Sequence, residues 1–234
     1  MKMIPLLLLM ASGTVAPADR HQVAATSAKA PVVVELFQSQ GCSDCPPAQI
    51  YLNRLADRPD LLALSFAVTY WDQLGWKDRF ASPQYTQRQR DYSARNGGAG
   101  VATPQFWIDG RETVLGADIA RVEQAIARGA PTGGPAIALA NDTVELRAGA
   151  APAGGADVWL VRYDPRTISV SISAGENDGK TILHRDIVRE LTPLGRWTGS
   201  ARTLSIPVAK TPGLRTAILV QEGRGGPIIA AAKA

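Results

Sequence analysis

Apolar and polar positions along the first half of the chain follow two periods, which predicts a mixture of strands and helices. Four short runs rich in β-branched and aromatic residues are typical of strands, while two amphipathic stretches and one polar stretch are typical of helices. In chain order these are strand 32–37, helix 48–55, strand 61–68, the polar surface helix 83–95, strands 106–108 and 113–115, and a helix from 119 onward. The predicted order is β-α-β-α-β-β-α.

Local turn chemistry supports the end of this series. Asp109-Gly110 lies between the last two predicted strands, and Asp-Gly is a strong hairpin signal because both turn residues adopt positive φ. Asp118 precedes apolar residues at helical spacing and is a suitable N-cap. The sequence therefore predicts a hairpin followed by a capped helix.

The second half of the chain has a different pattern, with short β-rich runs broken by Gly, Pro, Asn and Asp. The candidate strands are 143–147, 158–163, 167–173, 203–206, 215–221 and 228–231, with a turn at 177–179. Several short strands with turn signals are typical of a sandwich. A Gly- and Pro-rich linker at 131–135 separates the halves, so we expect an α/β domain over residues 31–130 and a smaller β-rich, sandwich-like domain over residues 135–234.

Composition narrows the class of protein. Of the 234 residues, 45% are hydrophobic, which is enough to bury a sizeable core. The chain has 25 Lys and Arg against 21 Asp and Glu, it has no run of five like charges, and its aromatic residues are not interleaved with basic clusters. We therefore expect no nucleic-acid partner. Two cysteines are too few for a disulfide-rich scaffold or a four-cysteine zinc site.

The N-terminus has the features of a secretory signal peptide over residues 1–18. A short basic start precedes an apolar stretch at residues 4–11, and Ala16-Pro17-Ala18 fits the small-residue cleavage rule. The apolar stretch is shorter than the roughly 20 residues that span a bilayer, although an uncleaved N-terminal anchor is the alternative. We expect a secreted or periplasmic protein with no membrane span after cleavage, in a compartment that permits disulfide chemistry.

The most informative motif is Cys42-Ser43-Asp44-Cys45, which follows the first predicted strand and precedes a helix. A redox dithiol requires this placement, because a helix N-terminus favours the thiolate of the first cysteine. A structural disulfide is one alternative, although so short a loop would add only about 2 kcal/mol of stability. Metal binding is the other alternative. We predict a redox pair without a metal or other cofactor, in which Cys42 is the exposed nucleophile and Cys45 the inner resolving thiol.

Two features qualify the reactivity of this pair. Pro46-Pro47 fits best in a first helical turn, so the helix is expected to begin nearer Cys45 than Cys42. Asp44 places a negative charge beside the sulfurs, which opposes thiolate formation. The extent to which the pKa of Cys42 falls is therefore left open by the sequence.

These residues carry a resemblance to a known superfamily. The strand, Cys42-Ser43-Asp44-Cys45, and then Thr103-Pro104-Gln105 ahead of a hairpin and a last helix resemble the thioredoxin-like superfamily. The resemblance implies a thioredoxin-like fold for residues 31–130, with Pro104 as a cis-proline facing the dithiol. Thr103 would then precede that proline, and Pro104 would position the substrate chain.

A narrower resemblance covers nearly the whole mature chain. The sequence is similar to a bacterial secreted family of thioredoxin-like proteins that is catalogued as a domain of unknown function. The motifs that carry this similarity are 35–42, Cys45-Pro46-Pro47, Tyr70-Trp71-Asp72, Gly75-Trp76, Thr103-Pro104-Gln105, Gly175-Glu176-Asn177 and His184. The family has no assigned substrate, so it implies a fold but no reaction.

Glu35 is a charged residue in an otherwise apolar strand, seven positions before Cys42. Thioredoxin-like proteins place a buried acid at about this point, so the resemblance implies that Glu35 accepts the proton of Cys45. A desolvated carboxylate has a raised pKa that suits this task. The spacing departs by one residue from the commonest pattern, and an acid on an edge strand facing solvent is the alternative.

Four residues after the second predicted strand could frame a substrate groove. Tyr70, Trp71, Asp72 and Trp76 follow a strand whose carboxyl end lies at the same sheet edge as the dithiol. Packing in the core is an equally good interpretation of these aromatic side chains. His184 is expected to be a hydrogen-bonded structural residue.

Three classes of function fit these features. The first is an exported thiol–disulfide oxidoreductase that acts on thiol- or disulfide-containing proteins of the exported compartment. The second is a non-catalytic binding module with a structural disulfide. The third, copper delivery, lacks a recognisable His or Met ligand near the dithiol. We favour the first, with Cys42, Cys45, Glu35 and Pro104 as its catalytic residues.

Overall fold

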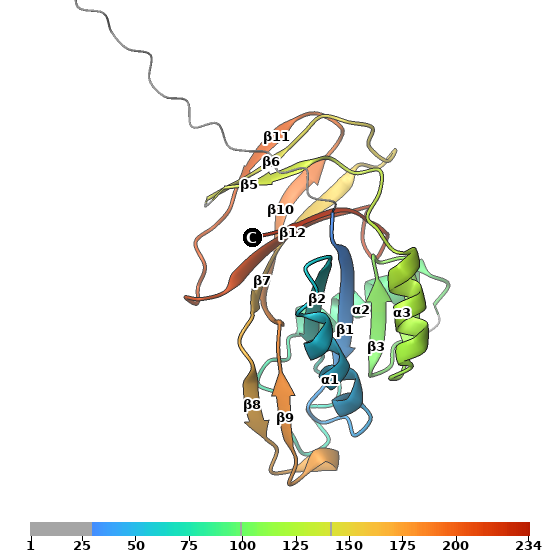
Figure 1. Cartoon of the computed structure of the whole chain (residues 1–234), viewed down its shortest axis with the longest axis vertical. Helices are drawn as coiled ribbons and strands as arrows, with labels where there is room; N and C mark the ends of the chain where they lie inside the picture. Colours follow the sequence, from blue (N-terminus) through green and yellow to red (C-terminus); the bar gives the residue numbers. More distant parts are fainter. Residues whose placement is uncertain (1–29, 99, 141) are drawn as a thin grey trace, which may run out of the picture.

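The computed structural model describes residues 30–98, 100–140 and 142–234, and the predicted signal peptide lies outside these residues. The first half of the chain has the predicted order of elements (Figure 1). They are β1 (Val32–Gln38), α1 (Cys45–Leu55), β2 (Leu61–Ala67), α2 (Pro83–Arg95), β3 (Gln105–Ile108), β4 (Glu112–Leu115) and α3 (Ile119–Arg128).

The second half is built almost entirely of strands. They are β5 (Ile137–Leu139), β6 (Thr143–Leu146), β7 (Ala156–Asp164), β8 (Ile168–Ser171), β9 (Thr181–His184), β10 (Ile187–Trp197), β11 (Arg202–Ser205), β12 (Arg215–Gln221) and β13 (Ile228–Lys233), with the short 3-10 helix η1 (Gly175–Asn177) between β8 and β9. The sequence analysis missed β5, β9 and β10.

The two halves share one sheet, which corrects the predicted division into separate domains. Eight strands lie in the order β13-β12-β7-β10-β2-β1-β3-β4. Strand β10 joins the halves, because it pairs in parallel with β2 at Ile187 and Ser65 and antiparallel with the whole length of β7. The structure is thus a mixed α/β fold with a central mixed sheet and additional β-rich parts.

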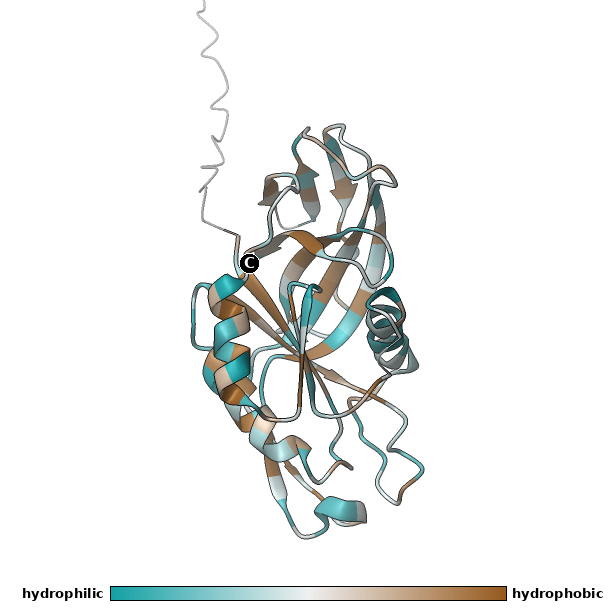
Figure 2. Ribbon diagram, turned by 90° about the vertical axis from the view of Figure 1, so that its right-hand side faces the viewer, coloured by the Kyte–Doolittle hydropathy of each residue, from teal (hydrophilic) through white to brown (hydrophobic). Residues whose placement is uncertain are grey.

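Helices cover both faces of the central sheet. Because successive side chains on a strand point to opposite faces, Val34 and Leu36 of β1 pack with α1 and α3, whereas Val33 and Phe37 pack with α2. The core on the α2 face also includes Val161 and other side chains of β7, β10, β12 and β13. Figure 2 shows the apolar strands, in brown, between helices on both sides.

A second, smaller sheet accounts for the expected sandwich-like packing. It has the order β11-β6-β5, and it packs its apolar face on β7, β12 and β13. Figure 1 shows it at one end of the molecule. The sandwich is therefore a local feature at one end of the shared sheet.

The β8–β9 hairpin is the third β structure. Its two strands pair only with each other, and the hairpin lies beside α1 (Figure 1). Asn53 of α1 donates a hydrogen bond to the Leu183 carbonyl at 2.8 Å. Apolar residues of the hairpin pack with Phe80 and Ala67. The hairpin thus brings η1 to the end of α1 that carries the dithiol.

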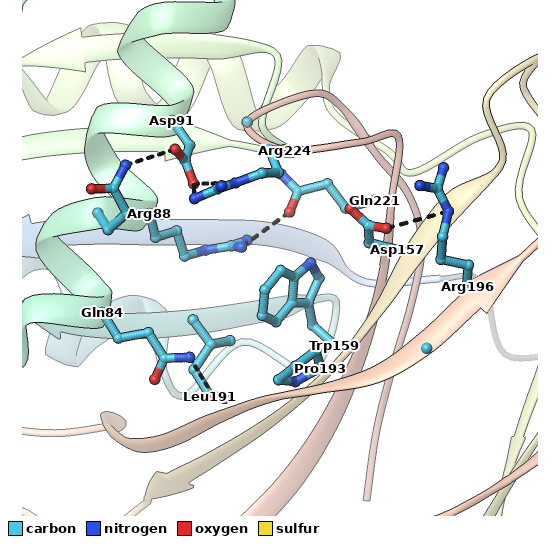
Figure 3. A pocket seen from close by; sticks show the side chains of 13 residues that line it. Gln84, Arg88, Asp91, Asp157, Trp159, Leu191, Pro193, Arg196, Gln221 and Arg224 are labelled. Carbon is cyan, nitrogen blue, oxygen red and sulfur yellow. Dashed lines mark hydrogen bonds and ion pairs between the residues drawn. The ribbon is translucent and has the colours of Figure 1, made fainter.

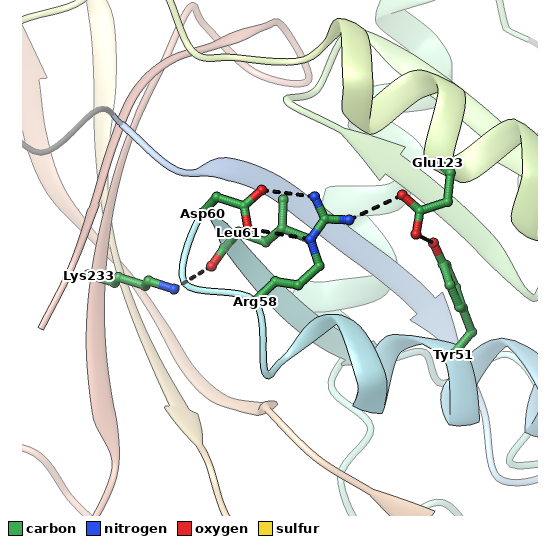
Figure 4. A network of polar contacts seen from close by, with 6 residues as sticks. All are labelled: Tyr51, Arg58, Asp60, Leu61, Glu123 and Lys233. Carbon is green, nitrogen blue, oxygen red and sulfur yellow. Dashed lines mark hydrogen bonds and ion pairs between the residues drawn. The ribbon is translucent and has the colours of Figure 1, made fainter.

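A network of polar contacts lies among α1, α3, the start of β2 and the C-terminal strand β13 (Figure 4). Arg58 forms ion pairs with Asp60 at 2.8 Å and with Glu123 of α3 at 3.1 Å, and Tyr51 of α1 donates to Glu123 at 2.6 Å. Lys233 of β13 donates to the carbonyl of Leu61. Since exposed ion pairs contribute little stability, we assign this network a role in orienting α1 and α3.

Candidate functional site

The dithiol lies in a tight turn between β1 and α1. The Cys42 amide donates to the Ser39 carbonyl at 3.2 Å, and the Cys45 amide donates to the Cys42 carbonyl at 3.2 Å. Helix α1 begins at Cys45, with Asp44 at the N-cap and Pro46-Pro47 in the first turn. This confirms the expected position of the helix start, because proline is tolerated where the amide has no intrahelical partner.

Both cysteines are free thiols, and both are only 1% exposed. The expectation that the Cys42 side chain is exposed is therefore wrong in this state of the protein. The Cys42 thiol lies 3.5 Å from the Thr103 carbonyl, to which it donates. Residues from three other segments contact the dithiol turn: the loop with Thr103, the loop with Trp76 and Asp78, and the η1 turn.

The environment of the two sulfurs separates their acidities. Hydrogen bonding from the Cys45 thiol is the main reason that the pKa of Cys42 falls to about 7; the Thr103 side chain and backbone amides add to this, and burial opposes it. Burial raises the pKa of Cys45 well above its ordinary value, and the hydrogen bond to Cys42 adds to the rise. Near neutral pH, Cys42 is therefore the sulfur with thiolate character, which is the form that attacks.

The loop that faces the dithiol contains the expected cis peptide bond, between Thr103 and Pro104. The Trp71 indole donates to the Thr103 hydroxyl at 2.7 Å, and Gln89 of α2 donates to the Ala102 carbonyl at 2.7 Å. These contacts fix the loop against the dithiol turn. Gln89, which is fully buried, was not singled out from the sequence, because nothing local distinguishes it from the other amides of a polar helix.

The four residues expected to frame a groove gather around the dithiol turn, and all are half-buried. Trp76 donates to the Gln40 side chain at 2.9 Å, Tyr70 donates to Gln89 at 3.2 Å, and Asp72 accepts the Asp78 amide at 3.2 Å. Burial raises the pKa of Tyr70 to about 12, and negative charge on the two cysteines adds to the rise. These side chains therefore pack in the wall of the site.

Asp78 is a second acid that the sequence analysis did not single out. Its carboxylate accepts the Gln40 amide and the Phe80 amide, each at 2.9 Å, so it braces the start of the dithiol turn. The side chain is 2% exposed, and burial raises its pKa to about 6. Its aspartate-rich loop gave no signal of this role, since the contact spans 38 residues.

The η1 turn contributes the remaining contacts. Asn177 donates to the carbonyls of Gln40 at 2.9 Å and Cys42 at 2.7 Å, and Glu176 accepts the Ser43 amide at 3.1 Å. Asn177 is fully buried. Gly175-Glu176-Asn177 carried part of the family resemblance, but the sequence gave these residues no role.

Glu35 lies in a different place from the one expected. Arg88 of α2 donates to both of its carboxylate oxygens, at 2.7 and 3.2 Å, and Tyr92 donates to it as well. The side chain is fully buried on the α2 face, whereas α1 and the dithiol belong to the opposite face. We therefore do not retain Glu35 as the proton acceptor for Cys45, and the alternative of a solvent-facing acid is also wrong.

The physical reason is the extra residue in the spacing. A shift of one residue along a strand moves a side chain to the other face of the sheet. Glu35 shares the face of Val33 and Phe37, which pack toward α2. It consequently meets Arg88 instead of Cys45.

His184 is buried, as expected of a structural residue, but neither of its ring nitrogens has a hydrogen-bond partner among the described residues. Its ring packs edge-on to Phe80 at a centroid distance of 5.7 Å. Burial lowers the pKa of His184 to about 4, with a smaller contribution from the charge of Arg79. The expectation of a hydrogen-bonded histidine is therefore wrong.

A separate cavity of about 420 Å³ lies between α2 and strands β7, β10 and β12 (Figure 3). Trp159, Leu191 and Pro193 form its apolar wall, and Arg88 and Gln221 form part of its polar wall. In the described parts of the chain, no group of three or more His, Cys, Asp or Glu is arranged to hold a metal ion. Nor does any described helix have the length and apolar composition to cross a membrane.

Comparisons with known proteins agree with this architecture. A family model described as "Protein of unknown function (DUF1223)" matches residues 33–221, and the chain belongs to this family. A crystal structure of a protein from Agrobacterium tumefaciens is 32% identical, with a TM-score of 0.72, over 88% of this chain and 95% of that chain. HBP35 of Porphyromonas gingivalis is 16% identical, with a TM-score of 0.53, over 88% of this chain and 75% of that chain, and it shares the fold alone. No curated protein matches the chain.

Proposed function

We propose that this protein is an exported thiol–disulfide oxidoreductase in which residues 31–130 have a thioredoxin-like arrangement. The observation that carries the proposal is the packing of the Cys42-Ser43-Asp44-Cys45 turn, at the N-terminus of α1, against the cis Thr103–Pro104 bond. The difference in acidity between Cys42 and Cys45 supports it, because the lowered pKa of Cys42 provides the thiolate that starts the exchange. The raised pKa of Cys45 keeps that thiol protonated until it resolves the mixed disulfide.

In the reducing direction, the exchange has two steps. The Cys42 thiolate attacks one sulfur of a substrate disulfide; that bond breaks, and the other substrate sulfur leaves as a thiolate that takes a proton from water. Cys45 then loses its proton to solvent and attacks the Cys42 sulfur. The mixed disulfide breaks, the second substrate thiolate leaves, and a Cys42–Cys45 disulfide forms. Two electrons pass from the dithiol to the substrate, and the reverse sequence oxidises a substrate dithiol.

The proposed partners are thiol- or disulfide-containing proteins of the secreted or periplasmic compartment. The predicted signal peptide supports this location. Thr103 and Pro104 would place the substrate chain beside Cys42, since the Thr103 carbonyl already lies 3.5 Å from that sulfur.

Trapping experiments test the exchange. Cys45→Ala removes the resolving thiol, so we expect reductant-sensitive adducts between Cys42 and exported proteins to accumulate. Cys42→Ala is the matched control, and it should accumulate few adducts because the raised pKa of Cys45 keeps that thiol protonated. Mass spectrometry of non-reduced complexes identifies the adducts, and a glutathione titration gives the reduction potential of the pair.

The opposite result would support a binding module. If Cys45→Ala traps no partner and the Cys42–Cys45 disulfide of the native protein resists glutathione, the pair is a structural staple. A structural disulfide typically has a potential below about −300 mV.

A further inference from the structure

The η1 turn lies at the tip of the β8–β9 hairpin. It forms hydrogen bonds with the backbone of the dithiol turn on both sides of Gly41. Both amide hydrogens of Asn177 are donated, one to the Gln40 carbonyl and one to the Cys42 carbonyl, and its oxygen accepts Lys180 at 2.9 Å. Asn177 is fully buried, and its contact with Cys42 spans 135 residues. Its side-chain hydrogen-bonding capacity is almost entirely used.

Two further contacts hold the η1 turn beside the dithiol turn. The Glu176 carboxylate accepts the amide of Ser43, the residue next to the nucleophilic sulfur. Gly175 has a φ of +75°, and a Cβ at this position would lie 3.3 Å from the Trp76 Cβ and 3.4 Å from the Leu74 carbonyl oxygen. The turn therefore approaches Leu74 and Trp76 closely enough that a side chain at position 175 would be tightly packed.

Almost nothing apolar holds the tip of this hairpin. Between residues 173 and 181, Asn177 alone is buried, and the apolar contacts of the hairpin lie further back along β8 and β9. The tip can therefore lift at the cost of a few hydrogen bonds, without exposing a core, which is typical of segments that open locally.

The nucleophile is buried, so the site has to open before Cys42 can react. Cys42 is 1% exposed, whereas attack on a disulfide requires its sulfur to meet the substrate sulfur in line. We propose that residues 175–177 form a latch that covers the dithiol and opens before Cys42 reacts. This inference rests on the proposed exchange function, and it gives the C-terminal half of the chain a regulatory role at the site.

Alkylation of Cys42 by iodoacetamide tests the latch without any protein substrate. In the reduced, full-length protein, Asn177→Ala removes both hydrogen bonds to the dithiol turn, so we expect Cys42 to be modified roughly tenfold faster. Asn53→Ala is the matched control, because Asn53 also ties the first half to the β8–β9 hairpin through a backbone carbonyl, but away from the sulfurs. That variant should match the wild type, with peptide mass spectrometry assigning the modified cysteine.

The pH dependence of the alkylation rate distinguishes greater access to Cys42 from a lower pKa of its thiol. The pKa of Cys42 is about 7, so at pH 9.5 its thiolate is almost fully formed in the wild type, and a variant cannot react faster there through a lower pKa. A latch predicts that the acceleration in Asn177→Ala persists at this pH. Equal rates in Asn177→Ala and the wild type would overturn the proposal, as would an acceleration that vanishes at pH 9.5 or an equal acceleration in Asn53→Ala.

A second pair of variants serves if Asn177→Ala does not fold. Gly175→Ala places a methyl group against Trp76 and should push the turn outward, whereas Gly179→Ala has a similar φ of +76° with nothing within 4 Å of its Cβ. We expect faster alkylation only in Gly175→Ala, and equal rates in the two would contradict the latch. The latch and the exchange function fail separately: alkylation needs no turnover, and the trapping of exported proteins does not depend on the alkylation rate.

Discussion

At the scale of single residues, the face of the sheet on which a side chain is buried decides which residue it pairs with, and nearness along the chain does not. Glu35 and the two cysteines are all buried within a few residues of one another along the chain, yet Glu35 pairs with Arg88 on the α2 face. The cysteine pair could be predicted because it is a local motif, and the cis-proline was implied by the resemblance to the thioredoxin-like superfamily. The sequence could not predict the partner of Glu35, which lies 53 residues away on a helix that reads as a polar surface helix.

Breaking the Glu35–Arg88 pair should destabilise the fold and leave the dithiol chemistry intact. Glu35→Gln leaves the buried Arg88 charge without its counter-ion, which costs about 3 kcal/mol. We expect a lower midpoint in urea unfolding and an unchanged alkylation rate at Cys42. The double variant Glu35→Met/Arg88→Met should recover part of the stability. Slower exchange at the Cys45 step in a folded Glu35→Gln protein would restore Glu35 as a proton acceptor.

His184 should make the native state sensitive to acid. Its pKa is about 4 when folded and about 6.5 when unfolded, so between these values the unfolded state binds more protons. Stability should therefore fall as the pH is lowered from 6.5 to 4, by roughly 3 kcal/mol from this residue. His184→Leu should show a smaller loss in urea unfolding measured across this range.

Buried aspartates have the opposite effect on the pH dependence of stability. Burial raises the pKa of Asp78, Asp109 and Asp186 to about 6 in the native state, so each favours folding as the pH falls through that value. Because both proteins contain them, the difference between His184→Leu and the wild type isolates the histidine. If the stability of the two proteins changes in parallel with pH, His184 does not contribute to the acid sensitivity.

At the scale of elements, the bounds of the strands and helices with regular patterns were predicted to within about three residues, whereas β5, β9 and the long strand β10 were missed. Pro193 and Gly195 interrupt its sequence, and both residues argue against a central strand. The strand accommodates them with register shifts at Val188/Glu190 and Pro193/Gly195. Tertiary pairing with β7 on one side therefore maintains a strand that local propensity disfavours.

The Asp109-Gly110 turn, in contrast, was predicted from its local sequence, and it also takes part in long-range packing. Gly110 has a φ of +62°, and a Cβ there would lie 2.7 Å from the Gly226 carbonyl oxygen and 2.9 Å from the Tyr92 ring. Gly110→Ala should cost roughly 2–3 kcal/mol, from backbone strain and the clash. Gly97→Ala, with a φ of +87° and open space around it, should cost only roughly 1 kcal/mol. Equal losses of stability for the two variants in thermal unfolding would mean that neighbouring residues move to accommodate the Cβ at position 110.

At the scale of the whole molecule, the two halves share one sheet and one core. The core on the α2 face combines side chains of β1 and β2 with those of β7, β10, β12 and β13. The linker at 131–135 suggested a domain boundary because the composition changes there, but composition does not reveal that β10 returns to pair with β2. A fragment of residues 30–130 would expose that edge and half of the core, so we expect it not to fold alone.

Cooperative unfolding of the full chain tests this unity directly. Among the described residues, the three α-helices all lie in the first half, so circular dichroism at 222 nm reports that half, while hydrogen exchange of β7 and β12 peptides reports the second. We expect the same urea midpoint from both measurements, because loss of either half removes apolar contacts from the common core. Two separate midpoints, with the strands of β7 and β12 protected after the helices are lost, would instead establish independent domains. In that case the hairpin carrying Asn177 could remain folded while its contacts with Cys42 are lost, and the latch would be a contact between domains.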